Sequence, residues 1–388
     1  MTVKNFDAMM NSKTIPFNRP ALSGRELDYV RQSAVSGELA GDEAFSKQCH
    51  NFLQSTLGVR RALLTPSCTH ALEMCALLLD IQPGDEVIVP SFTFVSTALA
   101  FHLRRAKLVF ADVRPDTLNL DERRLAELIT GKTRAIVVVH YAGVGCEMDE
   151  ILRVAAERNI PVVEDNAHGL FGKYRGRWLG TMGDLGVQSF HATKNFTCGE
   201  GGALLINSVR HVERAEIIRE KGTDRSRFFR GQVDKYSWVD TGSSYLLSDL
   251  QAAYLYAQLE RWESIQMERQ CLWERYAAEL GGWAAAQGVQ LPVVPAHCQQ
   301  AYHMFYLLLP SLAARTALIE HLKAAGVQAV FHYLPLHLSK MGVQLGSRVG
   351  DCPVTEDVSD RLLRLPFFNS LKEPDQSRVI AAVISFNV

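Results

Sequence analysis

Residues 186–207 read GVQSFHATKNFTCGEGGALLIN and place one lysine between two short apolar runs. The runs are typical of strands, and Lys194 lies in the polar loop between them, followed by three glycines. A lysine that neighbouring loops shield from water loses part of its preference for the charged form. It then becomes a nucleophile for an aldehyde, as Schiff-base chemistry needs. A lysine in a polar loop is also commonly just solvated, so the interpretation of Lys194 depends on residues elsewhere in the chain.

Length, charge and cysteine usage restrict the class of protein. The 388 residues, 47% of them hydrophobic, are enough for two globular domains with a substantial core. A net charge of -1 gives no overall attraction to nucleic acid or a membrane surface. The eight cysteines form no C-x-x-C pair, which argues against a zinc site or a disulfide framework. We therefore expect no metal site. Since the first residues have no signal-peptide pattern and no run of about 18 apolar residues occurs, we also expect a soluble cytoplasmic protein.

Predicted strands and helices alternate through the first two thirds of the chain. After two helices at 24–36 and 43–57, the predicted strands are 62–65, 86–90, 107–113, 134–140, 160–165, 186–190 and 203–206. The predicted helices between and after them are 69–80, 97–104, 122–129, 148–158 and 209–220. This alternation is typical of an α/β fold with a parallel sheet. No long helix separates the last two strands, so we expect the sheet to end in a differently wound portion.

A long predicted helix over residues 248–280 separates this pattern from the C-terminal part. The C-terminal elements form an α+β pattern, with predicted strands at 305–309 and 328–331 and helices at 312–325, 356–363 and 374–383. We place a domain boundary within the long helix. The prediction is an N-terminal extension over residues 1–13, a large domain over 14–260 and a smaller α+β domain over 261–388.

Two motifs follow predicted strands at the edge where parallel sheets bind ligands. Ser67 and Cys68, in TPSCTH, begin a helix whose free N-terminal amides attract a phosphate. An ordinary N-cap is the alternative for Ser67. Phe94, in PSFTFVST, is placed to stack on a flat cofactor or, alternatively, to pack in the core.

A third motif, VVEDNAHG, puts Asp165 at the end of an apolar strand and His168 in the loop that follows. A protonated pyridine nitrogen is a suitable partner for such a carboxylate, because the ion pair keeps the ring electron-withdrawing. A metal ligand or a plain strand-end acid is the alternative. His168 is then placed to reach the phenolic oxygen of the ring. Together with Lys194, these motifs describe a site for pyridoxal phosphate.

Over nearly its whole length the chain resembles the sugar-nucleotide aminotransferases of the DegT/DnrJ/EryC1/StrS type, and within them the dTDP-4-amino-4,6-dideoxygalactose transaminases. The resemblance rests on long motifs, including TPSCTHALEMCALLLD, PSFTFVSTALAF, VVEDNAHG and SFHATKNFTCGEGG. It implies a fold type I aminotransferase, with a large mixed-sheet domain and a homodimer that shares its active sites. It also implies pyridoxal 5'-phosphate as cofactor, with pyridoxamine 5'-phosphate as the intermediate form. L-glutamate would be the amino donor and a dTDP-4-keto-6-deoxyhexose the acceptor, for a surface glycan such as enterobacterial common antigen.

The resemblance also implies a role for each motif residue. Lys194 would bind the cofactor covalently and act as acid and base, Asp165 would pair with the ring nitrogen, and Phe94 would stack on the ring. His168 would lie near the phenolic oxygen. The implied phosphate ligands are Ser67, Cys68 and Ser189, with Ser244 of the partner subunit where many members have an asparagine in a G-Y-N-Y-R-M stretch.

Two further segments are candidates for substrate binding. Arg225, Arg227, Arg230 and Lys235 lie among aromatics in residues 221–238, as a nucleotide-diphosphate pocket needs, although a solvated loop explains them equally well. The candidates for a sugar-facing wall, in FHYLPLH, are His332, Tyr333 and His337, with core or interface packing as the alternative.

Two other functions compete with transamination. A sugar dehydratase of the same fold usually has histidine in place of the lysine, which Lys194 disfavours. A cofactor-binding regulator would need an additional binding module, which the near-zero charge and the domain pattern disfavour. The sequence leaves open whether the product has the galacto or the gluco configuration at C4.

Overall fold

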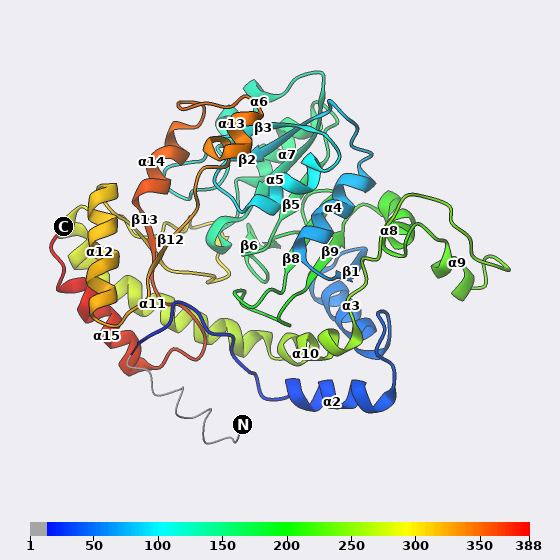
Figure 1. Cartoon of the computed structure of the whole chain (residues 1–388), viewed down its shortest axis with the longest axis horizontal. Coiled ribbons are helices and arrows are strands. Elements are labelled where there is room, and N and C mark those ends of the chain that lie inside the picture. The colour runs from blue at the N-terminus through cyan, green and yellow to red at the C-terminus, as the bar shows by residue number, and fades with distance from the viewer. Residues whose placement is uncertain (1–13) are drawn as a thin grey trace.

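The structure, a computed structural model, describes residues 14–388 and is built on a seven-stranded sheet (Figure 1). The extension predicted over residues 1–13 lies outside the described residues. In spatial order the strands are β1 (Arg61–Thr65), β9 (Gly202–Ile206), β8 (Leu185–Ser189), β5 (Val162–Asp165), β4 (Thr133–Val139), β2 (Glu86–Pro90) and β3 (Lys107–Ala111). Only β9 is antiparallel to its neighbours, β1 and β8. The sheet is therefore mixed, and the antiparallel pairs of β9 with β1 and β8 form the differently wound portion predicted at one end of the sheet.

Alternate residues of the central strands pack on opposite faces of the sheet. In β4, Ala135 and Val137 belong to one hydrophobic cluster, while Ile136 and Val138 belong to another. Because helices bury both faces, the strands read as nearly continuous apolar runs. One face is covered by α4 (Cys68–Leu78), α5 (Val95–His102) and α8 (Val212–Arg219). The other face is covered by α2 (Glu26–Ser36), α3 (Ala44–Leu57), α6 (Leu125–Leu128), α7 (Met148–Ala156) and α10 (Asp249–Leu259).

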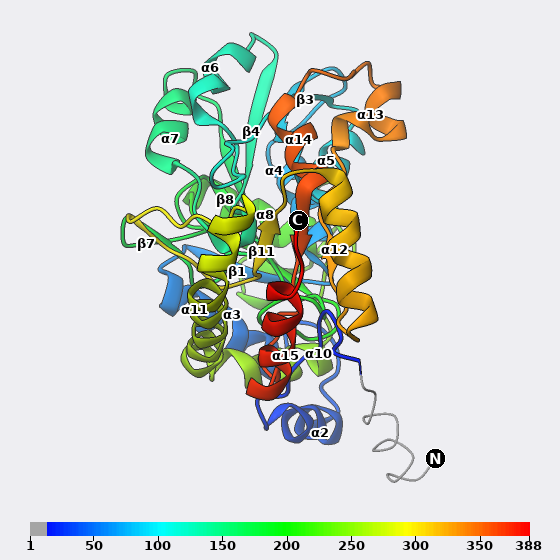
Figure 2. The same ribbon diagram turned by 90° about the vertical axis from the view of Figure 1, so that its left-hand side faces the viewer.

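The C-terminal part has its own three-stranded antiparallel sheet and its own hydrophobic cluster. Figure 2 shows how the helices of this part are arranged. The sheet consists of β11 (Tyr306–Leu308), β13 (Leu362–Arg364) and β12 (Val330–Phe331), in that order. Its helices are α11 (Trp262–Gln287), α12 (Leu312–Ala324), α13 (Lys340–Gln344), α14 (Pro353–Arg361) and α15 (Glu373–Ile384). A further three-stranded sheet joins β10 (Cys298–Gln299), β6 (Lys173–Tyr174) and β7 (Arg177–Trp178).

Three predicted elements differ from the structure. The helix predicted over 356–363 ends at Arg361, and the next residues form β13, because Leu362 and Leu363 are fully buried between two partner strands. The helix predicted over 122–129 is a 3-10 turn followed by the four residues of α6. The helix predicted over 248–280 is two helices, α10 and α11, which meet at Arg261.

The junction of α10 and α11 coincides with the predicted domain boundary, and the division into two domains stays a prediction. Ile15, at the start of the predicted large domain, packs in the C-terminal cluster and forms a parallel bridge with Val327. Short helix α9 (Arg225–Phe229) projects from the body of the molecule (Figure 1). Within residues 14–388, no helix is long and apolar enough to cross a membrane.

Candidate active site

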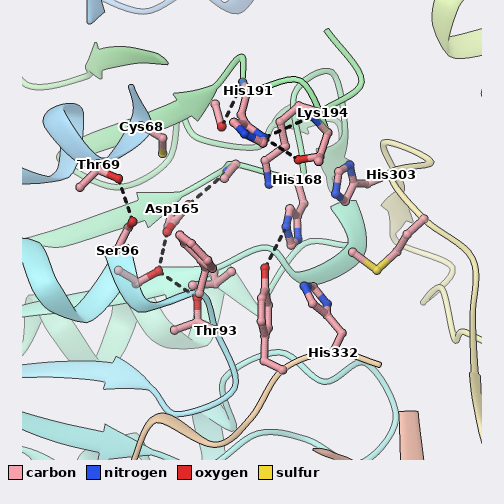
Figure 3. Close-up of a pocket in the computed structure, with 18 of the residues that line it drawn as sticks. Cys68, Thr69, Thr93, Ser96, Asp165, His168, His191, Lys194, His303 and His332 are labelled. Atoms are coloured by element: carbon pink, nitrogen blue, oxygen red, sulfur yellow. Dashed lines mark hydrogen bonds between the residues drawn. The ribbon is translucent and has the colours of Figure 1, made fainter. Parts of the chain in front are cut away.

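A cavity of about 790 Å³ lies between the carboxyl ends of the central strands and the C-terminal sheet. Parallel strands present their carboxyl ends at one edge, and this edge brings the separate sequence motifs together. The cavity is lined by Lys194 and by six other residues predicted to bind the cofactor, namely Ser67, Cys68, Phe94, Asp165, His168 and Ser189. Figure 3 shows the central members of this group facing one another.

Lys194 lies in the turn between β8 and β9, where its backbone N–H donates to the His191 carbonyl oxygen at 2.9 Å. Burial disfavours the charged ammonium and lowers the pKa of Lys194 to about 8, against the opposing influence of Cys68 and Asp165. A lysine with this pKa is partly neutral near physiological pH. The amine can therefore act as a nucleophile and can exchange a proton with a bound substrate.

Asp165 ends β5 and is buried. Its Oδ2 accepts a hydrogen bond from Thr97 Oγ1 at 2.7 Å, and its Oδ1 accepts one from the Ala167 N–H at 3.2 Å. Burial raises the pKa of the Asp165 carboxyl, because these two hydrogen bonds only partly replace water. The carboxylate keeps acceptor capacity for a cationic partner in the cavity. Thr97, from α5, was missed at the sequence level, since a threonine within a helix has no distinguishing pattern.

Two stacked histidines form one wall of the cavity (Figure 3). The rings of His168 and His303 are 4.2 Å apart and nearly parallel, and burial lowers the pKa of both well below the usual value. His168 Nε2 lies 3.5 Å from the Tyr333 hydroxyl, whereas its buried Nδ1 has no hydrogen-bond partner. His303 Nδ1 lies 2.9 Å from the amide oxygen of Asn195, which can only accept, so His303 donates from Nδ1. His303 was missed because it lies far from every recognised motif.

Three of the predicted phosphate ligands, Ser67, Cys68 and Ser189, line the cavity near the N-terminus of α4. Ser67 Oγ accepts from the His70 N–H at 3.2 Å, so Ser67 is an N-cap, the alternative interpretation of this residue. The amides of the first turn have no partner within the helix. A Cβ at Gly202 would lie 2.4 Å from Cys68 N, so β9 approaches this turn closely and glycine is required there.

The predicted substrate residues are only partly brought together. His332 and Tyr333 line the cavity, and His332 Nδ1 lies 3.0 Å from the Tyr141 hydroxyl. His337 does not line it: its ring is fully buried and bonds to Ser91 and Glu356, as the packing alternative describes. The residues that lie outside the cavity of their own chain are Arg225, Arg227, Arg230, Lys235 and Ser244.

Two arginines of residues 221–238, the α9 segment, form local ion pairs in place of a shared pocket. Arg230 pairs with Glu216 at 2.6 Å, and Arg225 approaches Glu220 at 3.8 Å. Ser244, which was predicted to act in the partner subunit, is exposed, and its backbone forms an isolated antiparallel β-bridge with Glu220.

The donor set of the cavity fits pyridoxal phosphate. The amine of Lys194 suits the aldehyde, and the under-partnered carboxylate of Asp165 suits the ring nitrogen. The unpartnered Nδ1 of His168 is a buried polar atom that a ligand in the cavity can satisfy. The free amides at the start of α4 suit the phosphate.

Comparison with known proteins also supports pyridoxal phosphate as the cofactor. Residues 20–384 match the DegT/DnrJ/EryC1/StrS aminotransferase family. An uncharacterized protein of Methanocaldococcus jannaschii, MJ1066, is 32% identical over 97% of this chain and 98% of its own. The aminotransferase TlmJ from Streptoalloteichus hindustanus is 31% identical, with a TM-score of 0.88 over 96% of this chain and 98% of its own.

A putative sugar aminotransferase from Streptococcus pneumoniae, Spr1654, in its PLP form, is 25% identical, with a TM-score of 0.88 over 96% of this chain and 98% of its own. The same protein in its PMP form matches equally well, with a TM-score of 0.88. The chain therefore belongs to the DegT/DnrJ/EryC1/StrS aminotransferase family and is a fold type I sugar aminotransferase that depends on pyridoxal phosphate.

Proposed function

We propose that this enzyme transfers the amino group of L-glutamate to C4 of dTDP-4-keto-6-deoxy-D-glucose. The products are dTDP-4-amino-4,6-dideoxy-D-galactose and 2-oxoglutarate. The observation that carries the transamination is the amine of Lys194, with a pKa of about 8, in one cavity with the buried carboxylate of Asp165. The choice of this nucleotide sugar is supported by the long sequence motifs that the chain shares with the dTDP-4-amino-4,6-dideoxygalactose transaminases.

Each residue of the cavity has a defined task in this proposal. Bound pyridoxal phosphate supplies the electron-withdrawing ring that stabilises negative charge at the α carbon of the donor. Asp165 keeps the ring nitrogen protonated, and Thr97 orients that carboxylate. Lys194 Nζ anchors the aldehyde and, once released, accepts the proton from the donor's α carbon. The neutral ring of His168 supplies a hydrogen bond without adding charge.

We also propose that the functional unit is a homodimer with shared active sites. Two aromatic side chains of the α9 segment are largely exposed: Trp238 is 81% exposed and Phe229 is 70% exposed. Exposed apolar surface of this kind is typical of a contact with another chain. In the dimer, the basic residues of this segment and Ser244 would reach the partner's cavity, where they would bind the diphosphate and the cofactor phosphate.

The visible absorption spectrum of the cofactor-loaded enzyme tests this function. Addition of L-glutamate should convert the aldehyde form to the amine form, and dTDP-4-keto-6-deoxyglucose should restore it. Proton NMR of the product then distinguishes an axial C4 amine (galacto) from an equatorial one (gluco). The Lys194→Ala variant is the control and should show no turnover. If the wild-type spectrum does not respond to glutamate, the proposed donor is wrong; if only the keto sugar has no effect, the proposed acceptor is wrong.

A further inference from the structure

The two stacked histidines of the cavity come from different parts of the chain (Figure 3). His168 follows β5 of the large sheet, whereas His303 lies in the loop before β11 of the C-terminal sheet. The contact of His168 Nε2 with the Tyr333 hydroxyl, at 3.5 Å, is long for a hydrogen bond. The orientation of the His168 ring therefore depends chiefly on its ring contacts, and the parallel stack with His303, at 4.2 Å, is the closest of these.

Asn195, the residue after Lys194, fixes the orientation of the His303 ring. Its amide nitrogen donates to the Ala301 carbonyl oxygen at 2.6 Å, which leaves its amide oxygen to accept from His303 Nδ1 at 2.9 Å. The same amide nitrogen also lies 3.3 Å from the side-chain oxygen of Gln266 in α11. These hydrogen bonds join the loop that carries Lys194 to residues 301–303.

Arg269, a buried residue of α11, holds the backbone of the same segment. Its Nε donates to the Tyr302 carbonyl oxygen at 2.8 Å, and its Nη2 donates to the His303 carbonyl oxygen at 2.7 Å. A third bond, from Nη1 to the Asn369 amide oxygen at 2.9 Å, fixes the guanidinium. Tyr302 has a φ of 49°, a conformation that a bulky residue adopts only where its surroundings impose it. Two charge-assisted hydrogen bonds to successive carbonyl groups supply this constraint.

We propose that His303 is a positioning residue that acts through His168. Asn195 and Arg269 in turn hold His303 in place. This role rests on the proposed function in one respect, the contact of His168 with the bound cofactor. Without the stack, the His168 ring would be free to turn about its Cβ–Cγ bond and would lose the orientation that it presents to a ligand in the cavity. The C-terminal part therefore supports a residue of the large sheet, through α11 and the loop before β11.

A double-mutant cycle on the affinity for pyridoxal phosphate tests this role, by fluorescence titration of the cofactor-free protein. His303→Leu removes the stack and the ring hydrogen bond, so the dissociation constant should rise by about 3- to 10-fold. His168→Ala should raise it at least as much. In the His168→Ala background, His303→Leu should change the constant less than about 2-fold, because the ring that it positions is already absent.

Two results of this cycle would overturn the proposal. If the effects of His168→Ala and His303→Leu multiply, His303 acts independently of His168. If His303→Leu binds the cofactor as the wild type does, the stack has no positioning role. A wild-type enzyme that does not respond to L-glutamate would contradict the proposed donor and would leave the outcome of the cycle unaffected.

A conservative variant and a matched control identify the acting contact. His303→Phe keeps a flat ring, so its affinity should lie between those of the wild type and His303→Leu; a value equal to that of His303→Leu would contradict the stack. His321→Leu is the control, because His321 also has a ring neighbour, Phe386 at 5.3 Å, and bonds to the Ala382 carbonyl oxygen at 3.0 Å, but does not line the cavity. It should bind the cofactor as the wild type does.

Two structural readouts separate positioning from packing. Crystals of cofactor-free His303→Leu should show the His168 ring turned away from its wild-type orientation, and an unchanged ring would contradict the proposal. Thermal unfolding shows whether His303→Leu and His321→Leu are equally well folded. A lowered midpoint in His303→Leu with an unchanged cofactor constant would assign His303 to packing alone and would equally overturn the proposal.

Discussion

Burial favours the uncharged form of most titratable side chains around the cavity. It lowers the pKa of Lys194 to about 8 and depresses that of His332, and it raises the pKa of the Cys68 thiol and the Tyr333 hydroxyl. Neutral donors and acceptors of this kind suit the hydroxyl and carbonyl groups of a sugar. The charged groups that remain at the wall then select for substrate groups of opposite charge.

The pKa of Lys194 predicts the pH dependence of cofactor attachment. The neutral amine is the reactive form, so the rate at which the cofactor-free protein binds pyridoxal phosphate covalently should rise with pH and level off above about 8. An ordinary lysine, with its pKa of 10.5, would give a rate that still rises above pH 9. Absorbance of the bound cofactor gives the rate, with Nα-acetyl-lysine as the reference amine. If the rate for the protein depended on pH in the same way as the rate for the reference amine, the lowered pKa of Lys194 would be contradicted.

The hydrogen bond from Thr97 predicts a shift in the acid limb of the activity profile. In Thr97→Val, Asp165 loses a donor that lowers its pKa, so that pKa should rise further and activity should fall off at a higher pH than in the wild type. We expect a loss of about 10-fold in kcat at neutral pH. Thr93→Val is the matched control, since Thr93 bonds to Thr97 at 2.9 Å and makes no bond to Asp165. If the two variants had the same pH dependence of activity, Thr97 would have no special role in positioning Asp165.

Among the elements, the contact between β9 and the start of α4 sets the position of the proposed phosphate site. The antiparallel pairing of β9 with β1 places Gly202 opposite Thr65, directly beside the turn that begins α4. A strand that carried a side chain at this position would push the helix N-terminus away from the cavity. In the proposed function, the reversed strand therefore positions the phosphate site in addition to pairing within the sheet.

Gly202→Ala should therefore reduce both stability and cofactor affinity. The added Cβ would meet the backbone of Ser67 and Cys68 at 2.4 Å, and backbone atoms cannot move aside cheaply. We expect a loss of about 1–3 kcal/mol in the free energy of unfolding, measured by denaturant titration. The control is Gly131→Ala, where nothing lies within 4 Å of the added Cβ and stability should be nearly unchanged. A Gly202→Ala protein as stable as this control would argue against the close approach.

On the scale of the whole molecule, the proposed shared active sites can be tested by mixing two inactive variants. One is Lys194→Ala, and the other neutralises the basic residues of the α9 segment, Arg225, Arg230 and Lys235. If α9 acts on the partner's cavity, each mixed dimer has one intact site, and a randomised mixture should recover about a quarter of wild-type activity. If α9 acts on its own cavity, both sites of a mixed dimer are defective and no activity returns.

Sedimentation provides the accompanying control. The wild type and both variants should each sediment as a particle of twice the 43.2 kDa chain mass. A monomeric wild type that is fully active would contradict the shared site, whatever the mixing experiment gives.

Local sequence patterns were enough to predict the α/β class and the cofactor, and Lys194 as the reacting lysine remains a prediction made from the same patterns. These predictions depend on local patterns. Apolar runs indicate buried strands, turn residues mark where the strands end, and each motif directly follows one of these strands in the sequence. Asp165 and Lys194 could be placed at this edge of the sheet because Asp165 ends β5 and Lys194 lies in the loop that follows β8.

The tertiary structure alone decided which other residues share the cavity. Thr97 in α5, His303 in the loop before β11 and Arg364 at the end of β13 all line the cavity, and their positions follow from helix packing and strand pairing between residues far apart in the chain. His337 shows the converse, since its motif suggested the cavity but packing buried it against Ser91 and Glu356. Leu362 and Leu363 form a strand because two neighbouring strands pair with them, and apolar residues of this kind fit a buried helix equally well. Long-range pairing, which no local pattern encodes, placed Arg364 at the wall of the cavity.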